Sequence, residues 1–244
     1  MKEISRKKEK MDNSYQSLLN DFAFKYVFGK ESKEANEALR VLLEVYLDLK
    51  IRRVKIIYPE MSKNVEEMKN TCFELLVDLE NFKQMKIEIH VVDQITERTS
   101  YFTYRAAHLY YNQDMEDKLF SEATRVILFV ISHEKYFEDS CLYQEAALYT
   151  EEGIFIGDAW KIAIVELPKL DESKSIEEMD QKEKMTYYLI HFKESQNNPK
   201  VKELLKEESI RIVNQRVKQI EEEKWKKLKD EYAYYVENEQ ELRF

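Results

Sequence analysis

Three side chains near the middle of the chain have the types and the spacing of a site that could hold a metal ion. Glu88 and His90 lie two residues apart in the alternating stretch MKIEIHVVDQ, and Glu74 lies in the preceding stretch TCFELLVDL. Carboxylates are the ligands that Mg²⁺ prefers, and bound Mg²⁺ activates water and stabilises charge on a phosphoryl group. The alternative is a strand face that simply meets water, which is the commoner arrangement.

The two stretches must be positioned by β-strands, because apolar and polar residues alternate in both. A turn around residues 80–83 predicts an antiparallel hairpin, which places Glu74 beside Glu88 and His90 on one face. This placement depends on the register, since a slip of one residue would move the side chains to the opposite face.

The remaining elements follow from the hydrophobic periodicity. Helices are predicted at about residues 20–28, 33–48 and 95–116, and strands at about 51–59, 124–132 (a buried strand) and 160–170, with a hairpin within 142–157. From residue 175 onward the chain is charged and helical, whereas residues 1–17 read as a flexible basic arm. The order predicts an α/β fold with a mixed sheet flanked by helices, followed by a helical C-terminal appendage.

The helix predicted over residues 95–116 carries a second set of candidate residues. Arg98, Tyr101, Arg105, His108 and Asn112 recur at spacings of three and four, so they share one face. Basic residues among aromatic ones suit a surface that follows a phosphate backbone. An ordinary exposed face with aromatic stems packed beneath it is the alternative.

Composition argues against several classes of protein. The chain has only three glycines and contains neither GxxxxGK[ST] nor GxGxxG, and its four histidines show no HxH or HExxH spacing. The formal net charge of −9 argues against a protein that simply coats nucleic acid. Two cysteines and the absence of a long apolar run predict a cytoplasmic protein with no membrane partner.

One motif resembles a known family. NDFAFKYVFGK is similar to the D-x-x-F-K-x-x-F-G opening of the PD-(D/E)XK nuclease family transposases, with matches at Asp21, Phe24, Lys25, Phe28 and Gly29. The similarity extends over about residues 20–172. Its later parts are Glu74, the triplet Glu88-Ile89-His90 at the family's E-x-Q, VVDQITER ending in Arg98, the run VILFVIS, and VELPKL.

The resemblance implies a restriction-endonuclease-like domain at residues 18–172 and a charged helical region at 173–244. It also implies Mg²⁺-dependent hydrolysis of DNA phosphodiester bonds, with Mn²⁺ as a substitute ion, in transposition or recombination. The implied catalytic residues are Glu74, Glu88 and His90, with Glu74 and Glu88 as metal ligands and Lys25, Arg98 and Arg105 as DNA contacts. Two positions depart from the family pattern, because Glu74 replaces an aspartate and His90 replaces Lys or Gln.

These departures keep a second hypothesis open. The chain could be a catalytically silent relative that acts as a nucleic-acid or protein interaction module. The amphipathic C-terminal helices would then offer a surface for self-association into a homo-oligomer.

Overall fold

The computed structural model describes residues 18–19, 21–30, 32–58, 73–81, 83–92, 99–113, 119, 122–194, 197–220 and 224–225. The basic arm at residues 1–17 and Arg98 lie outside these described residues. The described residues form two compact units. The sheet unit comprises residues 43–58 and 73–171, and the helical unit comprises residues 18–42 and 172–225.

The described elements follow the predicted order of helices, strands, helix, strands and helices. They are α2 (Asp21–Phe28), α3 (Lys33–Leu47), β1 (Ile51–Tyr58), β2 (Phe73–Leu79), β3 (Gln84–Val92), α5 (Thr99–Tyr111), β4 (Arg125–Ser132), β5 (Tyr143–Tyr149), β6 (Phe155–Glu166), the 3₁₀ turn η3 (Leu167–Lys169), α6 (Gln181–His191), the 3₁₀ turn η4 (Phe192–Glu194), α7 (Pro199–Leu204) and α8 (Glu208–Val217). None of the helices in this part of the chain is long and apolar enough to cross a bilayer.

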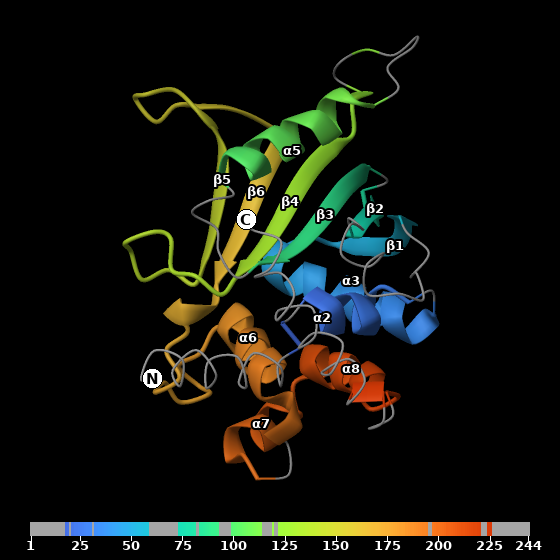
Figure 1. Ribbon diagram of the computed structural model, residues 1–244, viewed down its shortest axis with the longest axis vertical. Helices are drawn as coiled ribbons and strands as arrows, with labels where there is room; N and C mark the ends of the chain where they lie inside the picture. The colour runs from blue at the N-terminus through green and yellow to red at the C-terminus, as the bar shows by residue number, and fades with distance from the viewer. Residues whose placement is uncertain are drawn as a thin grey trace, which may run out of the picture. The chain divides into compact units, whose positions relative to one another are not determined.

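The sheet unit is built on one mixed sheet. Among the described residues its six strands lie in the order β1-β2-β3-β4-β6-β5. The pairs β3–β4 and β4–β6 are parallel, and β1–β2, β2–β3 and β5–β6 are antiparallel. Figure 1 shows the strands side by side with α5 running across them. This arrangement confirms the predicted mixed α/β sheet.

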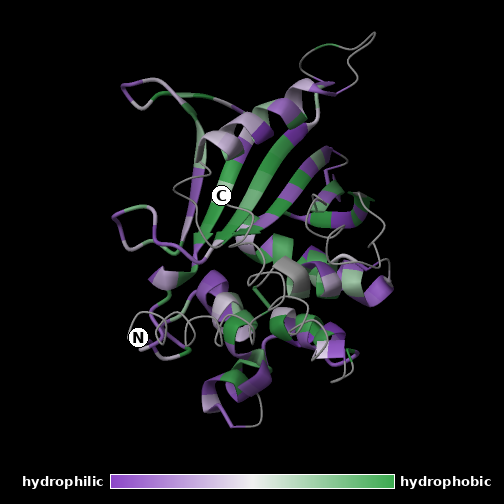
Figure 2. Cartoon of the chain, viewed as in Figure 1, coloured by the Kyte–Doolittle hydropathy of each residue, from purple (hydrophilic) through white to green (hydrophobic). Residues whose placement is uncertain are grey.

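Strand β4 lies in the interior of the sheet between two parallel neighbours. Every residue from Val126 to Ser132 is buried, which explains why the run VILFVIS is apolar without alternation. A strand covered on both faces buries all of its side chains, so each position favours an apolar residue. Figure 2 shows the hydrophobic colour along this central strand.

Within the sheet unit the two faces of the sheet pack against different segments. On one face Phe102, Ala106 and Leu109 of α5 pack against apolar side chains of β3, β4 and β6. Successive side chains of a strand point to opposite faces, so Phe129 of β4 lies on the other face. There it packs against Tyr46 near the end of α3, with ring centroids 5.4 Å apart. The core therefore holds α5 above β4 and β6, and Arg105 of this helix reaches Glu88 on β3.

The hairpin β5–β6 differs in part from its prediction. The sequence separates a hairpin at residues 142–157 from a later strand beginning near residue 160, whereas β6 runs without a break from Phe155 to Glu166. Gly157 lies within the strand and pairs with Leu148, where the register between β5 and β6 shifts. At the hairpin tip the apolar side chains are exposed, and they are Leu148, Tyr149, Ile154, Phe155 and Ile156.

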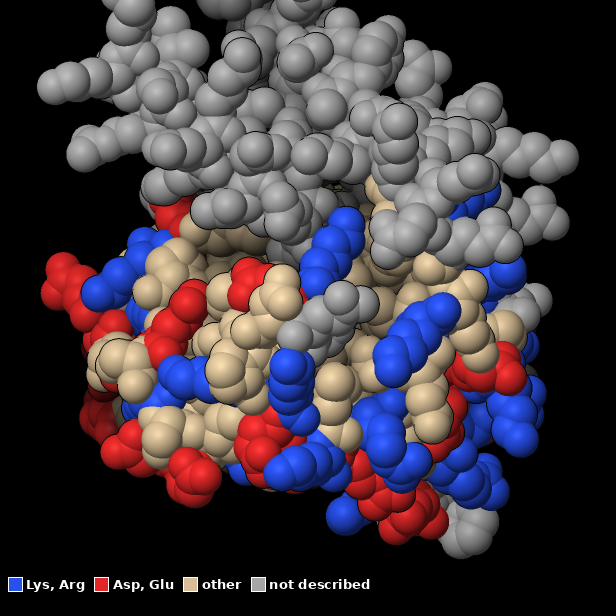
Figure 3. Space-filling view, turned by 90° about the horizontal axis from the view of Figure 1, so that it is seen from below, with Lys and Arg blue, Asp and Glu red and all other residues tan. Residues whose placement is uncertain are grey.

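The helical unit confirms the helical character predicted from residue 175 onward, as far as residue 217. Helix α6 begins with a capping box in which Asp180 and Glu183 satisfy each other's backbone N–H groups. Arg216 of α8 is buried and donates to the carbonyl oxygens of Val27 and Tyr26 near the end of α2. Figure 3, seen from the side on which α7 lies in Figure 1, shows basic and acidic side chains intermingled over this face.

Candidate active site

Glu74 of β2 and Glu88 of β3 are direct partners in the antiparallel ladder. Opposed residues of antiparallel strands have Cα atoms about 4.5–5.5 Å apart and side chains on the same face. The hairpin is closed at its turn by a hydrogen bond of 2.9 Å from the Leu79 N–H to the Lys83 carbonyl oxygen. The short turn thus fixes the register and brings together the two carboxylates that the sequence places on one face.

Glu88 is the most enclosed member of this set, since its side chain is fully buried beneath α5. Arg105 Nε lies 3.0 Å from each carboxylate oxygen, and Arg105 Nη2 donates to Oε2 at 2.8 Å. His90 Nε2 lies 2.6 Å from Oε1, two residues further along the same strand face. The Glu88 carboxylate is therefore clamped between a helix and its own strand.

The electrostatics of this clamp favour an ionised Glu88. Burial raises the pKa of the Glu88 carboxyl, because the charged form loses hydration. The hydrogen bonds and charges of His90 and Arg105 act in the opposite direction and outweigh burial, so the pKa lies below its ordinary value. Glu88 is thus a carboxylate at neutral pH, which is the form that a metal ion requires.

His90 is held in place by aromatic rings of α5 as well as by Glu88. Its ring centroid lies 5.6 Å from that of Phe102 and 6.1 Å from that of Tyr101, both in edge-on contacts. Since Phe102 is buried in the core, this contact limits the rotation of the imidazole. His90 is therefore a polar group held in one position, unlike a side chain that moves freely in solvent.

Glu74 has a looser environment than Glu88. It is half-buried, and its Oε1 lies 3.9 Å from Nζ of Lys86. Lys86 lies two residues before Glu88, on the same face of β3. At this distance the contact is an ion pair without a close hydrogen bond. Glu74 can consequently adjust its position toward a ligand more easily than Glu88 can.

The two carboxylates match Mg²⁺ in ligand type, and the ladder places them on neighbouring strands. Mg²⁺ is usually bound through one or two carboxylates together with substrate phosphates, and Glu74 and Glu88 supply two from neighbouring strands. Among the residues that the structure describes, no group of three or more His, Cys, Asp and Glu side chains is arranged to hold an ion. Arg105 already neutralises Glu88, so a metal ion would have to share this carboxylate with the guanidinium.

The residues predicted to contact DNA are placed differently from one another. Arg105 is partly buried and directed at Glu88, whereas the sequence pattern assigns it to the exposed face of the helix. Lys25 lies in α2 of the helical unit, while Arg98 is outside the described residues. The partnership of Arg105 with Glu88 is the main feature of the site that the sequence does not reveal.

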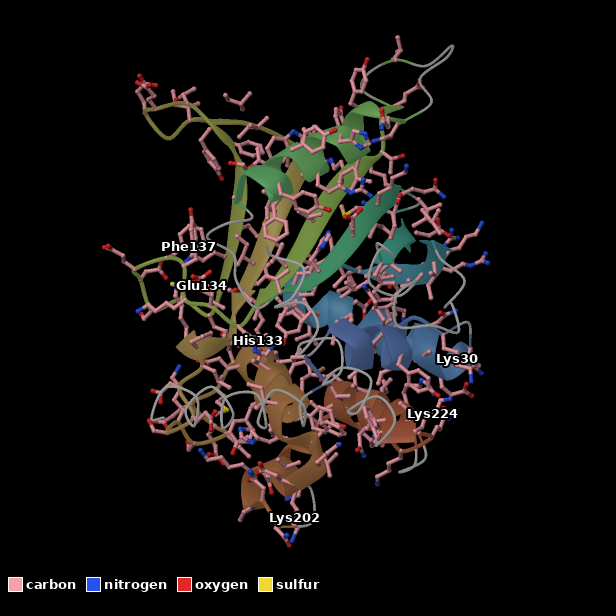
Figure 4. All side chains as sticks on the ribbon, viewed as in Figure 1. Lys30, His133, Glu134, Phe137, Lys202 and Lys224 are labelled. Atoms are coloured by element: carbon pink, nitrogen blue, oxygen red, sulfur yellow. The ribbon has the colours of Figure 1, made fainter. Side chains whose placement is uncertain are left out.

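A second buried ionic cluster lies in the sheet unit where β6 ends. Glu166 is fully buried and accepts hydrogen bonds from the N–H groups of Tyr136 and Phe137, while Lys169 Nζ lies 2.6 Å from its Oε2. Lys169 also reaches Asp139 at 3.1 Å. Figure 4 labels His133, Glu134 and Phe137 in the segment that this cluster fastens. VELPKL therefore anchors the loop between β4 and β5.

The fold and the site together define a class of protein. A six-stranded mixed sheet flanked by helices, with an acidic residue on β2 opposite the acidic residue of an E-x-H triplet on β3, is a restriction-endonuclease-like architecture. The family model described as PD-(D/E)XK nuclease family transposase matches residues 18–242. The chain belongs to this family. No curated protein and no solved structure matches it.

Proposed function

We propose that the chain is a Mg²⁺-dependent DNA endonuclease that hydrolyses phosphodiester bonds, with Mn²⁺ as a substitute ion. The observation that carries the proposal is the direct opposition of Glu74 and Glu88 in a chain of this nuclease family. The two carboxylates hold the metal ion, and the Ile89 carbonyl between Glu88 and His90 is a further candidate ligand. His90 orients the attacking water or the scissile phosphate.

The chain's own residues have distinct roles in this proposal. When bound, Mg²⁺ supplies a lowered pKa for water and stabilisation of the charge that develops on the phosphate. Glu88 stays ionised because His90 and Arg105 favour its charged form. His90 can donate a hydrogen bond from a fixed position, since the rings of α5 hold its imidazole.

DNA contact must be local in a chain with a net charge of −9. Helix α5 has the sequence TSYFTYRAAHLYY, which contains no acidic residue. The side chains of this helix therefore do not repel phosphates. Arg105, Lys25 and Arg98 are proposed as backbone contacts, of which Arg105 lies at the carboxylate centre itself.

Plasmid nicking with Mg²⁺ or Mn²⁺ tests the proposal. Glu88→Gln and Glu74→Gln should each abolish nicking, and Glu80→Gln, an exposed acid at the turn of the same hairpin, should nick like wild type. Glu74 is partly exposed, so its variant remains informative even if the loss of Glu88 unfolds the chain. Equal nicking by the wild type and both site variants would remove the proposal.

A second function is favoured by one observation, the clamp of Arg105 and His90 on Glu88. If these bonds are permanent, the chain binds nucleic acid or a protein without cutting. Calorimetry would then show no heat of Mn²⁺ binding, and DNA binding would weaken steeply with salt. Tight Mn²⁺ binding that disappears in Glu74→Ala would exclude this function.

The proposal also covers the location of the protein in the cell and its self-association. We place it in the cytoplasm, because it has only two cysteines and its proposed substrate is DNA. We also propose self-association through the helices between residues 173 and 244. Sedimentation of the full chain against a version that ends at residue 172 measures this, and an unchanged monomer fraction would contradict it.

A further inference from the structure

Helix α5 carries a row of rings on its outer side. Tyr101, Tyr104, His108 and Tyr111, which we call the aromatic stripe, recur at spacings of three and four. In a helix of 3.6 residues per turn these positions fall within an arc of about 80°. Tyr104 is 64% exposed and Tyr111 is 84% exposed, whereas Phe102, Ala106 and Leu109 on the opposite side are buried. The stripe is thus distinct from the core-facing side of the helix.

The aromatic stripe starts at the carboxylate centre. Tyr101 contacts the ring of His90, which in turn bonds Glu88. Tyr104 precedes Arg105, the partner of Glu88, and its ring lies 5.5 Å from that of His108. A ligand that lies along the stripe therefore reaches the proposed reaction centre at one end.

The dimensions and the charge of the stripe fit a particular ligand. The ten helical rises from Tyr101 to Tyr111 span about 15 Å, which is the length of about four stacked nucleotides. The helix has no acidic residue in a chain that contains 48 of them, and its basic residues are His108 in the stripe and Arg105, which is paired with Glu88. Exposed rings at intervals on a surface without acidic side chains are a feature by which proteins bind single strands, through stacking on bases.

We infer that the aromatic stripe is a stacking platform for the unpaired bases of a nucleic-acid strand that enters the Glu88 centre. This inference rests on the proposed function, since it takes the nuclease substrate as the ligand. It narrows the substrate class to single-stranded DNA or to DNA with frayed or flipped bases. Bases inside an intact duplex are stacked on each other and have no free face for these rings.

Fluorescence anisotropy without divalent ions tests the inference, because binding is then measured without cleavage. The probes are a 12-nucleotide oligothymidylate, the same backbone with abasic sites, and a 12-base-pair duplex. The variants are Tyr104→Ala, Tyr111→Ala and Tyr104→Phe in the full chain. Tyr149→Ala is the matched control, since Tyr149 is an exposed ring of the sheet unit that lies outside the stripe.

Loss of one stacking ring should weaken oligothymidylate binding about tenfold. Tyr104→Phe should restore wild-type affinity because the ring remains, and Tyr149→Ala should leave it unchanged. The abasic probe should bind weakly to wild type and equally to all variants.

Three results would overturn the inference. The first is equal oligothymidylate affinity for wild type, Tyr104→Ala and Tyr111→Ala. The second is an equal loss of oligothymidylate affinity in Tyr104→Ala and Tyr104→Phe. The third is that the stripe variants change sedimentation but not binding. The last result would assign the stripe to contacts between proteins. Failure of the nuclease proposal is separately visible, because stripe-dependent binding with no nicking in Mg²⁺ would refute cleavage and leave the platform intact.

Discussion

Arg105 of α5 donates hydrogen bonds to both carboxylate oxygens of Glu88 on β3, although 17 residues separate them in the chain. The carboxylate is fully buried and the guanidinium is partly exposed. This pair joins the helix to the strand in the middle of the candidate active site. It therefore affects both the stability of the fold and the chemistry that the site can perform.

The stability role of the pair can be measured by a double-mutant cycle. Arg105→Leu leaves a buried carboxylate without its guanidinium partner and should lower the free energy of unfolding by about 3–5 kcal/mol. Glu88→Leu combined with Arg105→Leu should recover most of this loss, because no charge is then left unpaired. Urea denaturation provides the values.

The exposed pair Glu203–Lys206 is the control for this cycle, since Glu203→Gln should cost about 0–1 kcal/mol. The pair would have no special role in stability under two conditions. Glu88→Leu and Arg105→Leu would each lower the free energy of unfolding as little as the control does, and the two losses would add in the double variant.

Arg105 should compete with a metal ion for Glu88. Arg105→Gln keeps a hydrogen-bond donor but removes the positive charge, and a unit charge at about 4 Å contributes about 1 kcal/mol or more. The Mn²⁺ affinity of this variant, measured by titration calorimetry, should therefore rise at least about fivefold. Unchanged or weaker Mn²⁺ binding would show that the ion does not share the carboxylate with Arg105.

The sequence resemblance predicts that His90 stands at the Lys or Gln position of the family pattern, so substitutions there separate its proposed roles. His90→Ala removes both the hydrogen-bond partner of Glu88 and the group proposed to orient water or phosphate, and should lower the nicking rate about 10- to 100-fold. His90→Gln retains a hydrogen-bond donor and should keep more of the rate. The measurement is nicking at saturating Mg²⁺, and a rate for His90→Ala equal to that of wild type would exclude an orienting role.

The ionic cluster at the end of β6 should make stability depend on pH in the acid range. The Cys141 N–H and the bonds to Lys169 and Gln144 lower the pKa of Asp139 to about 2. A carboxylate with a lowered pKa stabilises the fold above its unfolded pKa of about 4, and this effect is lost as the pH falls through about 2. Wild type should therefore exceed Asp139→Asn in urea midpoint at pH 7, and the difference should shrink between pH 4 and pH 2.

Glu151→Gln, at the exposed β5–β6 turn, serves as the control for that series because it removes the same charge outside the cluster. A difference between wild type and Asp139→Asn that stays constant from pH 7 to pH 2 would contradict the role of Asp139.

Local pattern was sufficient to predict the carboxylate pair. Alternation defined β2 and β3, and the short turn left little freedom of register, so Glu74 was expected near Glu88. The apolar run of β4 likewise predicted an interior strand. These features depend on residues close in sequence or on burial alone. Both leave a pattern of apolar and polar residues that can be recognised in a single sequence.

The bond between Arg105 and Glu88 could not be predicted in the same way. Helical spacing groups Arg105 with Tyr101 and His108, but it does not say how the helix is rotated on the sheet. That rotation is set by the packing of Phe102, Ala106 and Leu109 on β3, β4 and β6, which depends on the tertiary fold. The unbroken course of β6 through Gly157 has a similar cause, because pairing with β5 outweighs the local preference of glycine for a turn.

The exposed tip of the β5–β6 hairpin has a practical consequence for handling the protein. β5 is an edge strand, and the apolar side chains of Leu148, Tyr149, Ile154, Phe155 and Ile156 project beyond it. Open edges with apolar ends favour association between molecules, while the net charge of −9 opposes it by repulsion. Salt screens this repulsion, so the colloidal stability of the protein should decrease as ionic strength rises. Salt series of DNA binding are therefore best accompanied by light scattering, which separates weaker binding from incipient precipitation.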